Sequence, residues 1–443
     1  MIQTIRNAWK VQELRNKLLF TIFALLIFRV GSAIPVPFID TATLSTYMSA
    51  QSASIFGLLN VMSGDAFAQA TVFALSIQPY INSSIIIQLL TIAIPALERM
   101  AKDEGEEGKK KIAAITRYVT VAIALIQAYG YYTMINYYGL VQSGVWPAIV
   151  IIAAFTAGSA FVMWLGEQIT EFGVGNGISI ILFAGIVSRG PAMVSSMISG
   201  VRNWANGTTG ENVLNLHPVF IPLLIIGMLL LVFFVVFITN AERRIPVQYA
   251  KRVVGRKMYG GQSSHIPIKV NMSGVMPIIF AQAIASIPAT IGMFVPSAQT
   301  EGSGWNTFLK IFDSTGLIYC VVYFLLIVLF SYFYNTVQFN PVEVSNNLKK
   351  NGGFIPGFRP GKPTTDFLSK VISRITMFGA LYLAVVALLP AITGNIMNAF
   401  GSTAGSRLAI GGTSIIIVVG VALETVKALE AQLMMRHYKG FLE

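Results

Sequence analysis

Side chains that could carry out catalysis or hold a metal ion are few and widely spaced in this chain of 443 residues. The three histidines, His217, His265 and His437, have no metal-ligand or triad spacing. The single cysteine, Cys320, excludes an intramolecular disulfide and a thiolate metal cluster. No Walker A, HExxH or GxSxG sequence occurs. We therefore predict that the protein is not an enzyme and uses no cofactor.

Charged side chains are also rare within the apolar stretches of the chain. We find no Asp or Glu in the middle of any stretch, and the nearest, Glu424, falls at the end of the last one. Ion-coupled transporters usually need acids there, so this pattern argues against such a transporter without excluding it. Arg29 is the one charge deep inside a stretch. It either donates hydrogen bonds to carbonyl groups at a helix junction or faces an aqueous interior.

The composition is typical of a protein that crosses a membrane many times. Charged residues make up 11% of the chain and hydrophobic residues 54%, with a mean hydropathy of +0.67, whereas soluble domains have about 25% charged residues. A helix needs roughly 20 mostly apolar residues to cross the hydrocarbon. We therefore predict an all-α multi-pass membrane protein with ten spans, near 18–37, 69–92, 113–135, 145–165, 177–198, 218–240, 271–294, 316–338, 371–393 and 408–426.

The positive charges indicate how these spans are oriented. The formal net charge is +12, and 26 of the 31 Lys and Arg residues fall on the same side as both termini. Four, namely Arg189, Arg202, Lys310 and Arg407, fall on the other side. Cytoplasmic loops carry the excess of Lys and Arg, so both termini are predicted to be cytoplasmic. The same distribution argues against nucleic-acid binding, because there is no separate basic domain.

Two spans in equivalent positions are interrupted in a similar way. Ten spans divide into two five-helix halves, which would be inverted relative to each other because five is odd. Pro79 and Asn82 interrupt the second span, and Pro277 and Gln282 interrupt the seventh. Paired interruptions point to the functional centre of inverted-repeat membrane proteins. The alternative is a pair of ordinary kinked helices, since Pro is common in membrane spans.

Three further segments are longer or more apolar than a simple connection requires. Residues 53–65 are apolar but too short to cross, and form either a re-entrant segment or a surface helix. The loops 241–270 and 339–370 are basic and exceed about 12–15 residues, the usual upper range for connections without a function. Each is either a docking platform for a large cytoplasmic partner or a solvated basic face. In the second loop, rigid prolines would hold Arg359 at a fixed place.

Several long motifs follow one another in order along the chain: Pro79–Leu90, Met163–Thr170, Gly175–Ile180, Pro267–Asn271, Asn347–Lys350 and Gly411–Ser414. Together they resemble the SecY family, the central subunits of bacterial Sec protein-conducting channels, over about residues 13–441. The resemblance implies a central hourglass pore that passes unfolded secretory polypeptides across the plasma (inner) membrane. It also implies a lateral gate between spans two and seven, through which signal sequences and membrane segments reach the lipid.

The resemblance further assigns roles to individual residues. It implies an apolar ring at the constriction of the pore, formed by Ile77, Ile81, Ile178, Leu182, Ile279 and Ile417, with Leu182 departing from the commoner isoleucine. The implied gate residues are Pro79, Asn82 and Gln282, and a hydrogen bond between Asn82 and Gln282 is expected to favour the closed state. Residues 53–68 would be a plug that closes the outer funnel at rest, including Leu58, Leu59, Asn60, Met62 and Gly64.

The partners expected from the resemblance are those of a channel that other proteins drive. The implied docking residues are Arg256, Lys257, Arg359 and Pro360, on the surface that would contact the SecA motor ATPase or the ribosome. Other expected partners are the small membrane subunits SecE and SecG, signal sequences, translocating polypeptides and the lipid bilayer. The alternative function is that of an inverted-repeat secondary transporter of a small solute.

The predicted organisation divides the chain into five parts. They are an amphipathic cytoplasmic segment (1–17), a first five-helix half (18–198), an outer connection (199–217), a second five-helix half (218–426) and a cytoplasmic tail (427–443).

Overall fold

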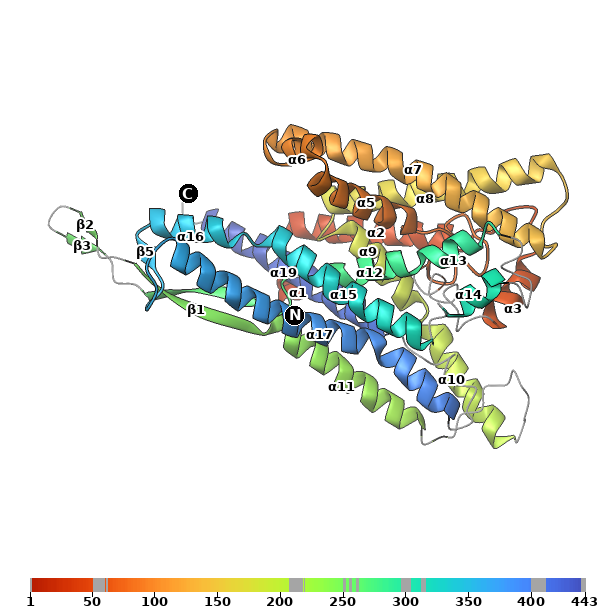
Figure 1. Ribbon diagram of the computed structural model, residues 1–443. Helices are drawn as coiled ribbons and strands as arrows, with labels where there is room; N and C mark the ends of the chain where they lie inside the picture. The colour runs from red at the N-terminus through yellow and green to blue at the C-terminus, as the bar shows by residue number, and fades with distance from the viewer. Residues whose placement is uncertain are drawn as a thin grey trace.

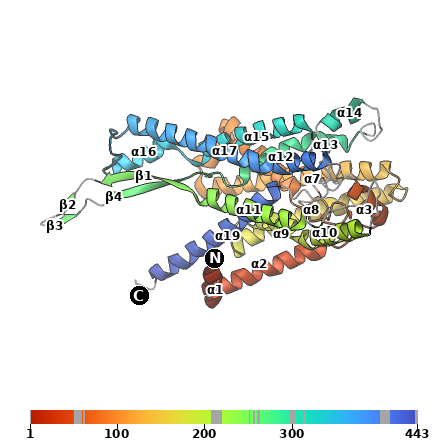
Figure 2. The same ribbon diagram turned by 90° about the horizontal axis from the view of Figure 1, so that it is seen from below.

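The structure is a computed structural model in which most helices run side by side along the long axis of the molecule (Figure 1). It describes residues 2–50, 60, 63–206, 218, 220–249, 252–254, 257–259, 263–295, 304–311, 316–399 and 412–439. The strands lie toward one end of the molecule, which we call the strand end, and α3 (Thr41–Ala50) and α14 (Gly304–Ile311) lie toward the opposite end (Figures 1 and 2).

Six helices in the described part of the chain are long and apolar enough to cross a membrane, or seven if one bent pair is included. The predicted number of ten spans is therefore not confirmed. Two predicted spans lie in helices that also carry charges beyond the span: α2 (Gln12–Gly31) begins with Glu13, Arg15 and Lys17, and α19 (Gly412–Lys439) ends in a charged segment. The six ranges are Gly105–Tyr137, Val145–Phe172, Gly177–Ala205, Ile221–Asn240, Leu317–Lys350 and Lys362–Leu389.

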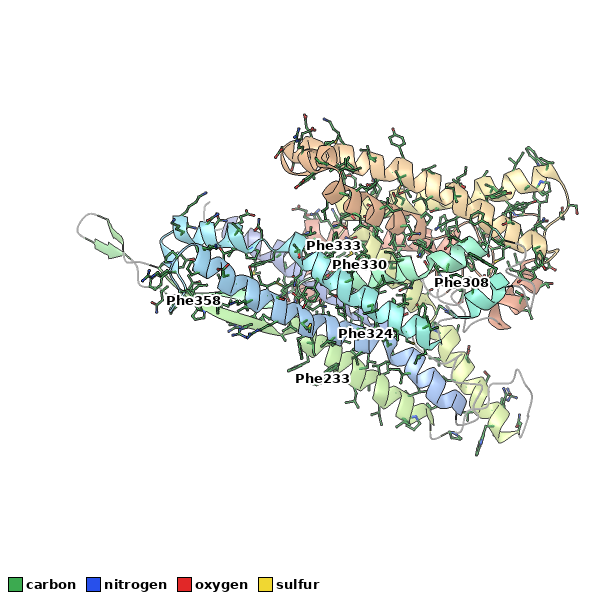
Figure 3. The ribbon with its side chains drawn as sticks, viewed as in Figure 1. Phe233, Phe308, Phe324, Phe330, Phe333 and Phe358 are labelled. Carbon is green, nitrogen blue, oxygen red and sulfur yellow. The ribbon has the colours of Figure 1, made fainter. Side chains whose placement is uncertain are left out.

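These ranges contain most of the long helices. They correspond to α7 (Gly105–Tyr137), α8 (Val145–Phe172), α9 (Gly177–Ser188) with α10 (Gly190–Ala205), α11 (Phe220–Asn240), α15 (Leu317–Gln338) with α16 (Pro341–Lys350), and α17 (Lys362–Ala399). The break between α9 and α10 falls at the Arg189–Pro191 interruption seen in the sequence. Much of α11 is not covered by other helices: Phe233 is 69% exposed and points away from the bundle (Figure 3).

The second and seventh predicted spans are both broken. The second was expected to begin near residue 69, but its helix α5 (Gln78–Ala93) begins nine residues later, because residues 64–77 form turns; it then bends by 105° into α6 (Pro95–Lys102). Pro79 stands in the first turn of α5, where a missing N–H costs no hydrogen bond. The seventh consists of α12 (Met276–Ala285) and α13 (Ile287–Gly292). The two broken spans lie against each other, since α5 contacts α12.

Two apolar clusters hold the bundle together. The central cluster draws buried residues from both halves of the chain, including α5, α8, α9, α12, α15, α17 and α19. The outer cluster lies toward the end that carries α3 and combines α3, α7 and α8 with the segment before α5. Burial of apolar surface in these clusters favours one arrangement of the helices, although in lipid close packing contributes more than the exclusion of water.

The all-α prediction is wrong for the two long basic loops, which form strands. Loop 241–270 contains β1 (Glu242–Tyr249), β2 (Arg252–Val254), β3 (Lys257–Tyr259) and β4 (Ser263–Lys269), and loop 339–370 contributes β5 (Gly353–Phe354). The strand order β4-β1-β5 joins the two loops in one antiparallel sheet. Ile245 and Val247 alternate with exposed residues and bury their side chains against α16 and α17.

The first and last helices of the described part of the chain contact each other. The amphipathic helix α1 (Ile2–Lys10) contacts α19, and the hydroxyl of Thr4 donates to the carboxylate of Glu430 at 3.0 Å. The buried residues Ala8, Leu14, Val174 and Leu429 form a small apolar cluster between these helices. The first and last helices of the chain are thereby attached to the same face of the bundle.

Candidate functional site

The six predicted ring residues come from different parts of the chain and meet in the central cluster. Ile77 precedes α5, Ile81 lies in α5, Ile178 and Leu182 lie in α9, and Ile279 and Ile417 lie in α12 and α19. Five of them are at most 6% exposed, and Ile178 is half-buried and packs against the cluster. Side chains that are up to 340 residues apart along the chain therefore belong to the same central cluster.

Gly166 of α8 lies where two of these side chains approach most closely. A Cβ atom at Gly166 would lie 3.4 Å from side-chain atoms of Ile77, Ile178 and Ile181. Ile77 and Ile178 therefore approach the backbone of α8 from different elements. Such an apolar contact layer has no acid–base capacity, but it can exclude water and ions while its side chains deform.

A pocket lies beside the ring residues, between them and the segment that precedes α5. The ring residues Ile77 and Leu182 line it together with Ser63 and Phe67. Buried Gln127 of α7 also lines this pocket. The ring residues and the end of the predicted plug therefore share one partly polar space.

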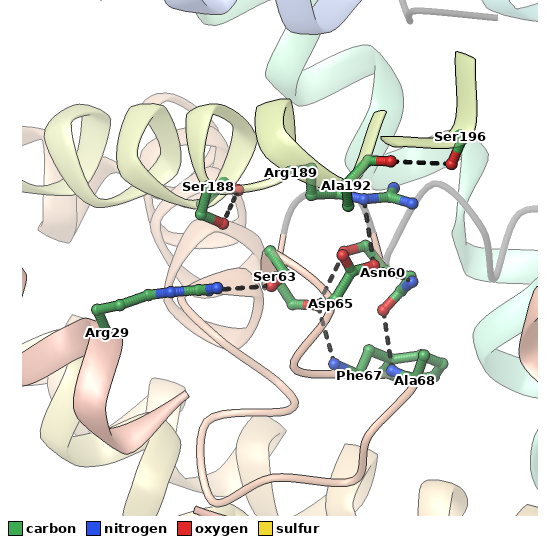
Figure 4. A network of polar contacts seen from close by, with 12 residues as sticks. Arg29, Asn60, Ser63, Asp65, Phe67, Ala68, Ser188, Arg189, Ala192 and Ser196 are labelled. Atoms are coloured by element: carbon green, nitrogen blue, oxygen red, sulfur yellow. Dashed lines mark hydrogen bonds and ion pairs between the residues drawn. The ribbon is translucent and has the colours of Figure 1, made fainter. Parts of the chain in front are cut away.

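The end of the predicted plug is held by a network of polar contacts (Figure 4). Leu58, Leu59 and Met62 lie outside the described residues. The side-chain amide of Asn60 donates to the carboxylate of Asp65 at 2.8 Å, and its oxygen accepts from the backbone N–H of Ala68 at 2.9 Å. These bonds close the turn that carries the chain from residue 60 toward α5.

Gly64 lies within this turn in a position that only glycine fits. Its φ of +66° is in the left-handed region, which costs about 1–2 kcal/mol for other residues. A Cβ atom there would lie 2.9 Å from the carbonyl oxygen of Gly185 in α9. The turn can therefore press its backbone directly onto α9.

Two arginines from outside the predicted plug bind this turn. Arg29 of α2 donates to the carbonyl oxygen of Gly64 at 3.4 Å, which agrees with its interpretation as a carbonyl-binding residue at a junction. Arg189, between α9 and α10, forms an ion pair with Asp65 at 3.1 Å. Sequence reasoning did not predict Asp65 or Arg189 as site residues. The available signal was that Arg189 is one of only four cations on its predicted side.

Comparison with known proteins assigns the chain to a family. The family model described as SecY matches residues 71–426. The chain belongs to the SecY family. It is 43% identical to the protein translocase subunit SecY of Streptomyces coelicolor, over 100% of both chains.

Solved structures of this fold superpose on most of the chain. One described as a protein-conducting channel gives a TM-score of 0.63 at 18% identity, with 94% of this chain and 92% of that chain covered. Sec61 from a canine ribosome-channel complex gives a TM-score of 0.59 at 18% identity and the same coverage. Together with membership of the SecY family, this fold makes the chain a multi-span, membrane-embedded channel subunit.

The family confirms the predicted protein-translocase function. The alternative, a secondary transporter of a small solute, is not favoured. In the described part of the chain, no group of three His, Cys, Asp or Glu side chains is arranged to hold a metal ion.

The predicted gate residues of this SecY-family chain lie on helices that contact each other. Pro79 and Asn82 are on α5, and Gln282 is on α12. The side-chain oxygens of Asn82 and Gln282 are both buried. Neither oxygen accepts from the amide of the other side chain, so the structure does not contain the hydrogen bond expected between Asn82 and Gln282.

The predicted docking residues are distributed over the two basic loops. Arg256 lies outside the described residues, and Lys257 is on β3, in the hairpin that extends from the strand end (Figure 1). Arg359 and Pro360 are exposed in the turn between β5 and α17. This turn is fixed on one side by the stacked rings of Phe358 and Phe367, with centroids 4.2 Å apart, and on the other by a 2.8 Å hydrogen bond from the hydroxyl of Thr364 to the carbonyl of Arg359.

Proposed function

We propose that this chain is the pore subunit of a protein translocase in the bacterial plasma membrane. It passes unfolded secretory polypeptides through its centre and has both termini in the cytoplasm. The observation that carries the proposal is that six apolar side chains, from α5, α9, α12, α19 and the residue before α5, belong to or pack against one central apolar cluster. Ten membrane spans in two inverted five-helix halves, 18–198 and 218–426, provide the frame.

The ring formed by these six side chains acts as a deformable seal. A narrow apolar constriction can lose its water and so block ions. Isoleucine and leucine side chains can change rotamer around a passing chain without leaving an unpaired polar group. The cluster is therefore suited to a substrate that has no fixed sequence.

The plug closes the pore at rest. Its turn at residues 60–68 lies over the pocket that the ring residues Ile77 and Leu182 line. Arg29 and Arg189 hold this turn against α2 and α10. An arriving polypeptide displaces the turn by breaking these contacts and the packing of Phe67 and Ala68 in the outer cluster.

The lateral gate opens between α5 and α12. Separation of these helices connects the pore with the lipid bilayer, so that signal sequences and membrane segments leave sideways. In the closed gate α5 packs against α12 without a hydrogen bond between the side-chain amides of Asn82 and Gln282, so opening it costs the loss of this packing. A signal sequence offsets this loss with its own apolar surface.

The basic loops bind the partners that supply energy or substrate. The exposed Arg359 and Pro360, together with Arg256 and Lys257, present positive charge and a rigid turn to the SecA motor ATPase or the ribosome. The ribosome is supported by the canine relative, whose structure is a ribosome-channel complex. The small membrane subunits SecE and SecG cover exposed helix faces within the bilayer.

Site-specific crosslinking tests the pore assignment. A photoreactive residue is placed at Ile81 or Ile279, and a secretory chain is stalled during translocation. Both positions are expected to crosslink to the stalled chain. Ile86 of α5, which is 43% exposed, is the matched control and is expected to crosslink weakly. The pore assignment is wrong if neither Ile81 nor Ile279 reacts in a preparation that contains the stalled chain.

A further inference from the structure

Met293 connects the two halves of the chain at the end of α13. Its side chain is 5% exposed and belongs to the outer cluster. Every other buried member of that cluster in the described part of the chain comes from residues 36–155. A single side chain of the second half is therefore inserted into a core that the first half builds.

Two further contacts fix this insertion to α7. The hydroxyl of Thr133 lies 2.8 Å from the carbonyl oxygen of Met293 and 2.7 Å from that of Gly130, so it shares its hydrogen between them. The next residue, Phe294, lies over Gly130, where an added Cβ atom would come within 2.6 Å of the ring. The absence of a side chain at Gly130 thus makes room for Phe294.

These contacts hold the end of α13 against α7, and we call the boundary between these two helices the seam. The seam continues along the contact of α5 with α12, since α5 packs on α7 and α13 follows α12. Met293 and Thr290 also line the pocket that reaches the ring residues Ile77 and Leu182. Met293 therefore lies both in the contact of α13 with α7 and at the pocket beside the ring.

We propose that Met293, Phe294, Thr133 and Gly130 form a latch that sets how apolar a signal sequence must be to open the channel sideways. The inference rests on the proposed lateral gate and names residues that determine its specificity. To open the seam, an entering helix has to replace the apolar contacts that Met293 and Phe294 lose. A weakly apolar signal helix offers too little surface to do so.

The test compares the export of two precursors, one with an intact signal sequence and one whose apolar segment has been weakened. In the variants Thr133→Val and Met293→Ala, export of the weakened precursor is expected to rise about threefold or more, the effect of losing one interhelical hydrogen bond. Gly130→Ala displaces Phe294 and is expected to act in the same direction. Export of the intact precursor is expected to stay unchanged in all three.

Two control variants match these substitutions in size and chemistry. Thr156→Val removes a hydroxyl that bonds only to the carbonyl of Ile152 in its own helix, at 2.8 Å, and Gly227→Ala adds a methyl group on α11 where no atom lies within 4 Å. Neither is expected to change the export ratio. The latch is refuted if the three test variants match these controls, or if they reduce export of both precursors equally at normal protein levels. Failure of the unaltered chain to export the intact precursor would instead refute the proposed function.

Discussion

The guanidinium group of Arg189 lies 3.1 Å from the carboxylate of Asp65 and so joins the start of α10 to the turn before α5. Both side chains are about one-third exposed, at 33% and 31%. Asp65 also accepts a hydrogen bond from Asn60, so its charge holds both the turn itself and the contact with α10. These polar contacts, together with the burial of Phe67 and Ala68 in the outer cluster, fix the described end of the segment that we propose as the plug.

Removal of this ion pair is expected to raise the resting ion leak of the channel. Partly exposed ion pairs contribute about 0–1 kcal/mol, so Asp65→Asn should increase the leak by up to about fivefold. Ion efflux from vesicles that contain the purified protein measures it. The charge swap Asp65→Arg with Arg189→Asp should restore part of the seal. Arg202→Gln, which neutralises an exposed cation on the same helix, is the control, and an equal leak in that variant would contradict the prediction.

A polar side chain in the ring is expected to let water and ions through. Burial of an isoleucine or leucine side chain contributes about 1.5–3 kcal/mol, so Ile81→Asn or Leu182→Asn should raise ion conductance about tenfold or more. Single-channel recordings in a planar bilayer would measure this. Ile86→Asn places the same side chain on the exposed face of α5. Equal conductance in the Ile86 and Ile81 variants would show that the ring is not the seal.

Reversal of the charge at Arg359 is expected to block motor-driven export while the channel still assembles. The side chain is exposed, so Arg359→Glu should change the stability of the fold by less than about 0.5 kcal/mol. A like charge placed against a docked partner costs several kcal/mol, so export should fall by about tenfold or more. Export by membrane vesicles with added SecA measures the effect. Lys370→Glu, also exposed, is the control, and normal export by the Arg359 variant would refute the docking site.

Protonation of Asp40 is expected to loosen the start of α3. The carboxylate accepts from the hydroxyl of Thr43 at 2.6 Å and from its backbone N–H at 3.3 Å, and these bonds hold the pKa of Asp40 below its usual 3.8. Because the folded pKa is lowered, the stabilisation is fully present above the unfolded value and is lost as the pH falls through the folded one.

Hydrogen exchange of the α3 amides, corrected for intrinsic rates, measures this loss of protection between pH 5 and pH 2.5. Asp40→Asn carries no charge to lose and should show no such step. A step of the same size in both proteins would assign the change to another group.

The long apolar helices could be predicted from the sequence because their signal is local. Helices such as α11 and α15 are continuous apolar runs of about 20 residues, which suits them to a membrane whatever surrounds them. The convergence of the six ring residues followed from the family resemblance rather than from spacing. Spacing placed Ile77 with Ile81, but it could not show that Ile279 and Ile417 meet them.

Other features depend on contacts that no local pattern reveals. Residues 64–77 have the apolar composition expected of a membrane-spanning helix. Asp65, Ala70 and Ser76 nevertheless adopt positive φ angles, and contacts with α2, α8 and α10 hold this segment. The insertion of Met293 into the outer cluster likewise depends on contacts between distant parts of the chain. The small sheet was also not predicted, although the alternation around Ile245 and Val247 that is typical of a strand is present in the sequence.

The pairing of β1 with β5 has a mechanical consequence. Residues Gln248 and Tyr249 of one basic loop are bonded to Phe354 and Gly353 of the other, so a push on Arg359 cannot move one loop alone. The backbone hydrogen bonds transmit this force from β5 to β1 and from β1 to β4. Six residues separate the end of β4 from the start of α12. The sheet thus connects both basic loops mechanically to the first turn of α12, the helix that we propose as one side of the lateral gate.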